Sequence, residues 1–326
     1  KGESTVNKKT KAWLISASVL TALGLIIFAA VMTVCDLDFA KLGTVTYVTE
    51  TYKADGDFEK ISVNAETSDI EFIPADDGKC TVECFESEKV KHSVSVKDGT
   101  LVIETTDTRK WYEHICISFV KPKVSVYLPK SEYASLSVET DTGNITVPRD
   151  FSFENIGISG DTSDVDCRAA AADTVEIKVT AGGIVMDGLS AERLNLTSAT
   201  GDIRVNSAAV GADIGIKTNT GNVKLTDTFC SDILAETDTG NITFKNVEAA
   251  GGISARSDTG NVGFEDSDAE NIIVRTSTGN VTGTLLSEKV FVTKTSVGKV
   301  SVPRTVSGGK CEITTSTGDI RIDIRK

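Results

Sequence analysis

The sequence has few of the residues that enzymes most often use for catalysis. Its 326 residues include two histidines, His92 and His114, and no tryptophan follows Trp111. Nucleophile motifs, phosphate-binding loops and dinucleotide fingerprints are missing from the sequence. Enzymes that cleave polysaccharides need clustered acids or bases, and they usually hold the sugar with exposed aromatic rings. We therefore expect a non-enzymatic protein and place a carbohydrate-active enzyme last among the alternatives.

Clustered positive charge and paired cysteines are lacking as well. The formal net charge is −13, whereas nucleic-acid sites need grouped Lys and Arg, so we expect no nucleic-acid partner. The cysteines are scattered, odd in number and without zinc spacing, which predicts no disulfide framework, metal or cofactor. They are Cys35, Cys80, Cys84, Cys116, Cys167, Cys230 and Cys311. We expect most of them to be small buried residues.

One long uncharged run lies near the N-terminus. Residues 12–34 are 23 residues without a charge, enough to cross a bilayer core of roughly 30 Å. Four lysines precede the run, and Asp36 and Asp38 follow it. The positive-inside rule then predicts a cytoplasmic tail at 1–11, a transmembrane anchor at 12–34 and an extracytoplasmic body. A cleaved signal is disfavoured by the length of the run, and a lipoprotein signal ending at Cys35 by Val34 before it.

A single short motif is abundant. Residues 140–145, Thr-Asp-Thr-Gly-Asn-Ile, return at 237–242, with close variants at 257–262, 276–281 and 315–320. The glycine position defines copies 1 to 10 in order: Gly143, Ser163, Gly182, Gly201, Gly221, Gly240, Gly260, Gly279, Gly298 and Gly318. The period of 19 or 20 residues is typical of a stacked-repeat protein.

The columns of the aligned copies separate inward from outward positions. Two residues after the glycine position every copy has Val or Ile, from Ile145 to Ile320, and the fourth residue is apolar except at Gly283. The fifth and seventh residues before it are also largely apolar. Spacings of two predict short strands with one inward face, and the break in parity predicts a corner at the glycine.

These observations predict an all-β fold, a right-handed parallel β-solenoid (β-helix) of about ten coils. Coils paired at about 4.8 Å would give a stack roughly 48 Å long. We assign residues 131–326 to the repeats and 44–130 to an N-terminal β cap with a hairpin insertion. The expected strands of the cap are 79–85, 92–97, 101–105 and 123–128, with Asp98 and Gly99 as a hairpin turn. Residues 66–70 resemble a degenerate copy of the motif.

The recurring Thr-x-Thr-Gly-Asn/Asp-Ile/Val, with the N-terminal anchor and residues 38–42 (Asp-Phe-Ala-Lys-Leu) behind it, resembles the bacterial putative-adhesin family of β-strand repeat proteins. The resemblance covers about residues 36–326 and implies a β-helix displayed at the envelope of Gram-positive bacteria. It implies no catalytic residues. Copies 2 and 3 depart from the motif at 161–165 and 180–184, so we expect irregular stacking there.

The residue after the glycine position suggests a ladder between coils. That column holds Asn144, Asp164, Asp202, Asn222, Asn241, Asn261, Asn280 and Asp319. Stacked amides can hydrogen-bond from coil to coil, which is a structural role. The alternative is calcium, with oxygen ligands from Asp141, Asp161, Asp238 and Asp258 two residues before the glycine position. The nonapeptide pattern of calcium-binding rolls is missing, so we favour the ladder.

The Thr-x-Thr pairs suggest the ice-binding face of some insect antifreeze proteins. The pairs are Thr140 and Thr142, Thr218 and Thr220, Thr237 and Thr239, Thr276 and Thr278, and Thr315 and Thr317. Their parity matches that of the inward columns, so we expect them to line the inner corner instead. Parity likewise places Phe244, Phe264 and Phe291 in the core.

The remaining function hypotheses concern surfaces. Lys217, Arg256, Arg275 and Lys294 share an outward column that could engage an anionic envelope polymer. Our leading hypothesis is a membrane-anchored, extracytoplasmic scaffold for adhesion or interaction, whose partner is an envelope polymer or protein. The alternative is a self-assembling module, because the last coil, 319–326, lacks a clear cap. Its alternating charges, Arg321, Asp323 and Arg325, are instead typical of edge protection.

Overall fold

The structure is a computed structural model that describes residues 8–37, 45–111 and 120–325. The chain divides into two compact units, one made of Lys1–Tyr47 with Thr108–Lys121 and the other of Val48–Asp107 with Pro122–Lys326. Our expectations for residues 1–7 and 38–42, and for His114 and Cys116, lie outside the described residues.

Helix α1 (Lys8–Val34) belongs to the first unit. Its 27 residues give a length of about 40 Å at 1.5 Å per residue. Within residues 9–34 only Met32 is buried, so the apolar side chains have almost no protein to pack against. The helix is long and apolar enough to cross a membrane, a property that signal sequences share.

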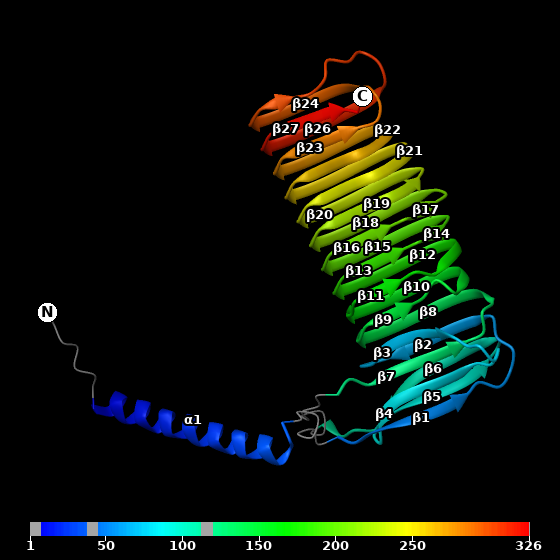
Figure 1. Ribbon diagram of the computed structural model, residues 1–326, viewed down its shortest axis with the longest axis vertical. Coiled ribbons are helices and arrows are strands. Elements are labelled where there is room, and N and C mark those ends of the chain that lie inside the picture. The colour runs from blue at the N-terminus through cyan, green and yellow to red at the C-terminus, as the bar shows by residue number, and fades with distance from the viewer. Residues whose placement is uncertain (1–7, 38–44, 112–119, 326) are drawn as a thin grey trace. The chain divides into compact units, whose positions relative to one another are not determined.

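The second unit is a parallel β-solenoid, as the repeat predicts (Figure 1). Each coil has a strand before the glycine position, on the first sheet, and a strand after it, on the second. The strands before it are β8 (Glu132–Thr142), β10 (Ser152–Thr162), β12 (Ala170–Ala181), β15 (Arg193–Thr200), β18 (Asp213–Thr220), β20 (Asp232–Thr239), β24 (Lys289–Val297) and β26 (Gly309–Thr317). The strands after it are β9 (Ile145–Val147), β11 (Val165–Cys167), β13 (Ile184–Asp187), β16 (Ile203–Asn206), β19 (Val223–Cys230), β23 (Val281–Leu285), β25 (Val300–Ser301) and β27 (Ile320–Ile324). β21 (Ile242–Thr259) and β22 (Val262–Thr278) run from one coil into the next, and β14 (Ser190–Ala191) and β17 (Ala209–Val210) add a short third side.

Equivalent residues of neighbouring coils pair in register. Ile177 of coil 3, for example, is the partner of Ile158 in coil 2 and of Leu196 in coil 4. The irregular stacking expected at coils 2 and 3 is therefore wrong over Asn155–Thr162 of β10, which pairs with β12 in one register. The single shift between these strands, at Phe153 and Asn155, lies before that stretch.

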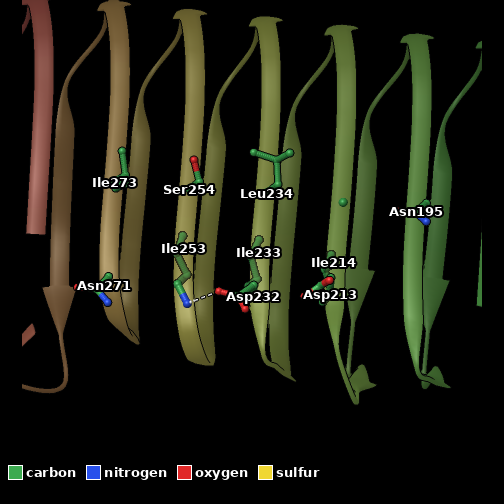
Figure 2. A pocket seen from close by; sticks show the side chains of 12 residues that line it. Asn195, Asp213, Ile214, Asp232, Ile233, Leu234, Ile253, Ser254, Asn271 and Ile273 are labelled. Carbon is green, nitrogen blue, oxygen red and sulfur yellow. Dashed lines mark hydrogen bonds between the residues drawn. The ribbon is translucent and has the colours of Figure 1, made fainter. Parts of the chain in front are cut away.

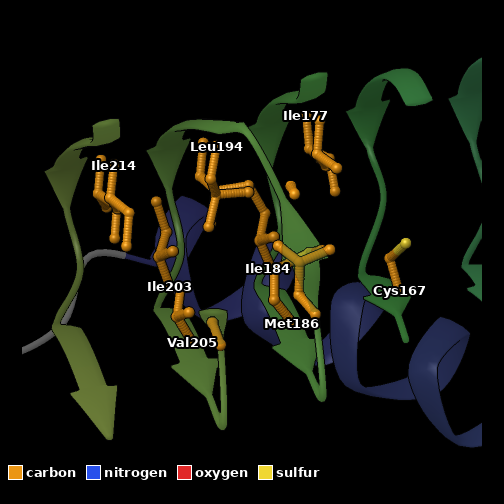
Figure 3. Close-up of a cluster of buried hydrophobic side chains, with 14 of the residues drawn as sticks. Cys167, Ile177, Ile184, Met186, Leu194, Ile203, Val205 and Ile214 are labelled. Carbon is orange, nitrogen blue, oxygen red and sulfur yellow. The ribbon is translucent and has the colours of Figure 1, made fainter. Parts of the chain in front are cut away.

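The inward columns form one continuous core. Figure 3 shows Ile177, Leu194 and Ile214 of successive first-sheet strands beside Ile184 and Ile203 of the second sheet. These side chains are nearly inaccessible to solvent, as the column analysis predicts. Of the six cysteines that the structure describes, all are free thiols, and all except Cys35 are buried, which confirms their expected role.

The glycine position is a corner where two coils approach closely. At Gly221 φ is 158°, and a Cβ there would lie 2.0 Å from the carbonyl oxygen of Gly201 in the coil below. Such a Cβ would lie 1.9 to 2.0 Å from a carbonyl oxygen of the neighbouring coil at Gly143, Gly201, Gly240, Gly260, Gly279, Gly298 and Gly318 as well. Close stacking, in addition to backbone conformation, therefore requires glycine.

A second corner lies six residues after the glycine position in coils 3 to 7. It is formed by residues with positive φ, namely Gly188, Ser207, Asp227, Asn246 and Asp266. Short polar side chains and glycine tolerate the left-handed region best, which explains this column. We did not predict this second corner from the sequence.

The asparagine and aspartate column is a ladder, as predicted. Asn222 Oδ1 accepts a hydrogen bond from the backbone N–H of Asn241 at 3.0 Å, and Asn241 Oδ1 accepts one from that of Asn261 at 2.9 Å. Side-chain oxygens make the same bond to the next coil at Asp69, Asn144, Asp164, Asp202, Asn261, Asn280 and Asp319. Each rung therefore binds one coil to the backbone of the next.

The chain is threaded out of sequence order at its C-terminal end. β26 of coil 10 pairs with β22 of coil 8 on one side and with β24 of coil 9 on the other. β27 lies between β23 and β25 in the same way. The ladder follows this order, because Asn280 accepts from Asp319 N at 2.8 Å and Asp319 accepts from Lys299 N at 2.7 Å. The last coil is therefore an internal layer, and coil 9 is the end of the stack.

This order corrects three expectations. Residues 319–325 are not a free end that could stack on another protomer. Arg321 lies in the part of β27 that β25 covers, so it does not protect an edge, and Arg325 pairs with Asp266 at 3.2 Å. Phe291 of coil 9 is only partly buried, because no coil covers it. Phe244 and Phe264 are buried as expected, and their stacked rings have centroids 5.1 Å apart.

The N-terminal end is also threaded out of order. β2 (Lys60–Ala65) and β3 (Asp69–Pro74) form an opening coil that pairs with β8 and β9, which confirms the degenerate copy at 66–70. β6 (Thr100–Asp107) and β7 (Lys123–Leu128) pair parallel to β2 and β3 on the other side. β1 (Tyr47–Lys53), β4 (Thr81–Ser87) and β5 (Val90–Lys97) complete the cap. β5 and β6 are antiparallel around the predicted turn, where Asp98 and Gly99 have φ of 48° and 70°.

Candidate functional site

The threonine pairs divide between the inside and the outside of the corner. Thr218, three residues before the glycine position, is buried and donates to the Gly201 carbonyl of the coil below at 3.1 Å. Thr220, one residue before it, is exposed. The expectation that both members of a pair line the inner corner is wrong for the second, because both residues just before the glycine face solvent where the chain turns. One exposed rank of threonines results, and the two-rank array of an ice-binding face does not form.

The aspartates considered for calcium lie on the same outer corner. Asp141 and Asp161 are in adjacent coils, as are Asp238 and Asp258. Asp161 accepts from Thr180 at 3.3 Å, and Asp258 contacts Arg256 at 3.4 Å. Within the described part of the chain these aspartates do not gather into a group of three metal-ligating side chains. Their placement fits solvated corner residues.

An open groove of about 650 Å³ crosses the outward face of the first sheet in coils 4 to 8 (Figure 2). It is shaped by two outward rows. The row six residues before the glycine position contains Asn195, Gly215, Leu234, Ser254 and Ile273. The row eight residues before it contains Asp213, Asp232, Gly252 and Asn271. We call this surface the groove.

Strand alternation positions the groove. On β20, Ile233 points into the core, so its neighbours Asp232 and Leu234 must face outward. Leu234 is 47% exposed and Ile273 is 36% exposed, so two large apolar side chains of this row face solvent. Gly215 and Ser254 alternate with them and leave room between them. The row is therefore an apolar floor interrupted by gaps. Such a floor suits an extended partner whose side chains can enter the gaps.

The acidic edge of the groove is formed by two stacked aspartates. Asp213 and Asp232 are register partners on β18 and β20. Asp232 Oδ1 accepts from the backbone N–H of Gly252 at 2.7 Å, which fixes its position (Figure 2). Among the described residues, neither aspartate is in an ion pair within 4.0 Å. Two neighbouring carboxylates of this kind would favour a cationic group on the partner.

The predicted basic column forms the opposite edge. Lys217, Arg256 and Arg275 lie four residues before the glycine position, next to the apolar row on the same face. Glu236 lies between Lys217 and Arg256 in the stack, 4.0 Å from the Lys217 ammonium. The column is therefore mixed in charge. Lys294 is separated from Arg275 by Thr314, because coil 10 lies between coils 8 and 9.

Charged residues end the apolar row at coil 10. Glu312 continues the row beyond Ile273, and it contacts Arg275 at 3.8 Å and Lys310 at 2.7 Å. The hydrogen bond from Lys310 holds the pKa of Glu312 below its usual value. The apolar floor is thus confined to coils 5 to 8.

The sequence contained a signal for the groove that our column analysis did not use. We predicted the inward positions from columns that stay apolar, and the outward positions only from charge, whereas the groove row changes from Gly to Leu, Ser and Ile along coils 5 to 8. Apolar residues at an outward parity, in Leu234 and Ile273, were the available signal. The groove could have been found by searching outward columns for them.

Comparison with known proteins identifies the family. The sequence model of the family described as Toastrack DUF4097 matches residues 58–228 and 209–326. The chain belongs to this family. The match covers the opening coil and all ten repeats of the Toastrack body, and it confirms the resemblance drawn from the motif. Comparison with curated proteins gives no match.

Several solved structures are similar to this Toastrack chain. A "putative adhesin" from Bacteroides fragilis is 17% identical, covers 85% of this chain and 97% of its own, and has a TM-score of 0.44. A "putative adhesin" from Parabacteroides distasonis is 16% identical, with 74% and 98% covered and a TM-score of 0.47. A "putative lipid binding protein" from the same species is 16% identical, with 86% and 98% covered and a TM-score of 0.46.

Proposed function

We propose that the protein is a membrane-anchored, extracytoplasmic and non-enzymatic scaffold that binds an envelope polymer or protein through the groove. The lysines before the span support an orientation with residues 1–11 in the cytoplasm and the solenoid outside. Two of the similar solved structures are named "putative adhesin", and we propose the same kind of role here. The observation that carries the proposal is the exposure of Leu234 and Ile273 between two charged edges.

The stacked coils suit the groove to an extended partner. Its rows run along the stack, with equivalent residues repeated at about 4.8 Å, so a chain that lies along the solenoid meets five coils in succession. The apolar floor supplies contact area, and the charged edges orient the partner and speed its association. The ion pairs of Arg256 and Arg275 are exposed, so these side chains can exchange partners at little cost.

Binding of the full chain to isolated envelopes of the source organism tests the proposal. We expect Leu234→Asp with Ile273→Asp to reduce affinity by about tenfold or more, since desolvated apolar anchors dominate such contacts. Phe229→Asp is the matched control, because Phe229 is 54% exposed but follows the second sheet on β19. Equal binding by the double variant and the wild type, or a loss confined to Phe229→Asp, would refute the proposal.

Charge reversal distinguishes the two classes of partner. If the partner is an anionic polymer, Arg256→Glu with Arg275→Glu should weaken binding strongly, and the binding that remains should depend less on salt. A polypeptide held mainly by the apolar floor should lose only part of its affinity. Glu139→Lys in coil 1 lies in the same column outside the groove and serves as the control.

A further inference from the structure

Coil 9 leaves one end of the solenoid uncovered. Its strands β24 and β25 pair with β26 and β27 of coil 10, and within the described part of the chain no strand pairs with their other edges. At the opposite end, β1, β4 and β5 complete a cap. A free strand edge presents unpaired backbone N–H and C=O groups to another chain. The end of coil 9 can therefore accept a further strand.

Apolar side chains gather at this end. Coil 9 and the loop after it contain five valines that are between 39% and 97% exposed, namely Val290, Val292, Val297, Val300 and Val306. Phe291 and Val302 pack against the core but are only partly buried, so the core itself reaches the surface here. A cluster of exposed apolar side chains of this kind is typical of a contact surface.

Strand alternation sorts the side chains of β24 into two faces. Phe291 and Thr293 are half-buried on the core side, whereas Val290, Val292 and Lys294 are exposed on the outward face of the first sheet. Glu288, directly before the strand, is exposed and has the same parity as the outward residues. The outward row from 288 to 294 thus begins with an acid, continues with two valines and ends with a base.

This outward row is self-complementary in one antiparallel register. When two copies of β24 pair about Phe291, Val290 lies opposite Val292 of the second copy. Glu288 then lies opposite Lys294 of the second copy, and the two Phe291 side chains meet on the core side. Apolar pairs and opposite charges that face each other directly stabilise a sheet. The neighbouring registers that keep the same faces place Lys294 opposite Val290, or Glu288 opposite Val292.

The two charged side chains are available for this pairing. Glu288 Oε2 accepts from the Ser307 hydroxyl at 2.5 Å, and the other carboxylate oxygen has no partner among the described residues. Within the same part of the chain, neither Glu288 nor Lys294 is in an ion pair within 4.0 Å. Ser307 and Thr305, which donates to the Lys289 carbonyl, tie the loop after coil 9 to the start of β24. The strand edge after Lys289 is left for a partner.

We propose that coil 9 is a self-association surface, on which β24 of one copy pairs antiparallel with β24 of a second copy. A two-fold axis along the normal of the first sheet relates the copies, and two-fold dimers are the commonest homo-oligomers. Each copy covers the exposed end of the other core. Because the surface pairs with itself and the opposite end is capped, the assembly stops at a dimer. The groove spans coils 4 to 8, so either proposal can fail without the other.

Sedimentation of the full chain in detergent tests the charge pairing. We expect a dimer, and Glu288→Lys or Lys294→Glu should each weaken it by about tenfold because like charges then lie opposite each other. An equal mixture of the two variants should recover the affinity of the wild type, since both pairs are again of opposite charge. Lys224→Glu, on the outward face of the second sheet, is the control and should dimerise normally.

The mixture separates this surface from association through α1, which would not respond to charges on β24. Both side chains are exposed, so we expect each variant to melt like the wild type. A wild type that stays monomeric at high concentration, or a mixture that associates no better than its components, would overturn the proposal.

Disulfide crosslinking tests the register. Opposite side chains of an antiparallel pair have Cβ atoms about 5 Å apart, so Glu288→Cys mixed with Lys294→Cys should form a crosslinked dimer upon oxidation. Either variant alone should not exceed the wild type, because its own two cysteines would lie about 20 Å apart along the paired strands. The wild type oxidised in parallel is the control for the native thiols. No additional crosslink in the mixture, or equal crosslinks in each variant alone, would contradict antiparallel pairing about Phe291.

Discussion

The corner and the groove lie on the same strands but differ in what is repeated. At the corner, glycine, a hydroxyl side chain and Asn or Asp recur, and each contacts the next coil, as with Gly221, Thr218 and Asn222. In the groove the row from Gly215 to Ile273 changes at every coil, and its side chains face solvent. The repeated residues hold the stack together, whereas the variable residues are available to a partner. Substitutions at the corner should therefore affect stability, and those in the groove should affect binding.

The largest effect should come from filling the corner. Gly221→Ala places a Cβ 2.0 Å from the Gly201 carbonyl oxygen at a φ of 158°. Overpacking and backbone strain together should lower the free energy of unfolding by about 3 kcal/mol or more, and the Tm by roughly 6 to 12 °C. Gly263→Ala is the matched control, because a Cβ there has no atom within 4 Å. Equal melting of both variants would remove the close-approach explanation.

A slightly smaller effect should come from the buried ion pair at the out-of-order end. Lys289 of β24 is 3% exposed, and its Nζ lies 2.7 Å from Asp268 of coil 7. Lys289→Ala leaves the Asp268 carboxylate without its partner and should cost about 3 kcal/mol. Thermal unfolding measures the loss. Lys245→Ala removes an exposed pair with Glu265 and should change the Tm little, so equal losses would contradict the threading of coil 9.

A single rung of the ladder should matter less. Asn241→Ala removes the bond that its Oδ1 accepts from Asn261 N and the one that its Nδ2 donates to Asn222. We expect a loss of about 1 kcal/mol and no change in envelope binding. Asn219→Ala is the control, because Asn219 is exposed two residues before the glycine position, outside the ladder. A larger loss for Asn219→Ala than for Asn241→Ala would show that the ladder does not bind the coils.

The regular part of the fold could be predicted from sequence because it depends on local periods. Val223 and Leu225 have the spacing of an inward strand face, and Gly221 marks the change of parity, so core and corner follow from short-range sterics. The second corner had its own signal in Asp227, Asn246 and Asp266, which a search for short polar residues at a fixed offset would have found.

The order of the coils could not be predicted in this way. Phe291 and Cys311 occupy the same column, and nothing local states which of them packs on Ile272. The pairing of strands that are far apart in the sequence decides the order of the coils. Lys299 was an indirect sign, because a lysine in the ladder column cannot accept a bond from a further coil. The exposure of Thr220 was missed for a related reason, since strict alternation fails where the chain turns.

Site-specific photo-crosslinking tests the central claim most directly. A photoreactive residue placed at Leu234 in the groove, at Lys224 on the second sheet or at Phe229 beyond it samples three surfaces of neighbouring coils in the anchored protein within its native envelope. We predict adducts to a defined envelope component from position 234, preserved with Asn241→Ala and lost with Ile273→Asp. Equal adducts from all three positions, or adducts from 224 or 229 alone, would contradict the claim that the variable row of the first sheet is the binding surface.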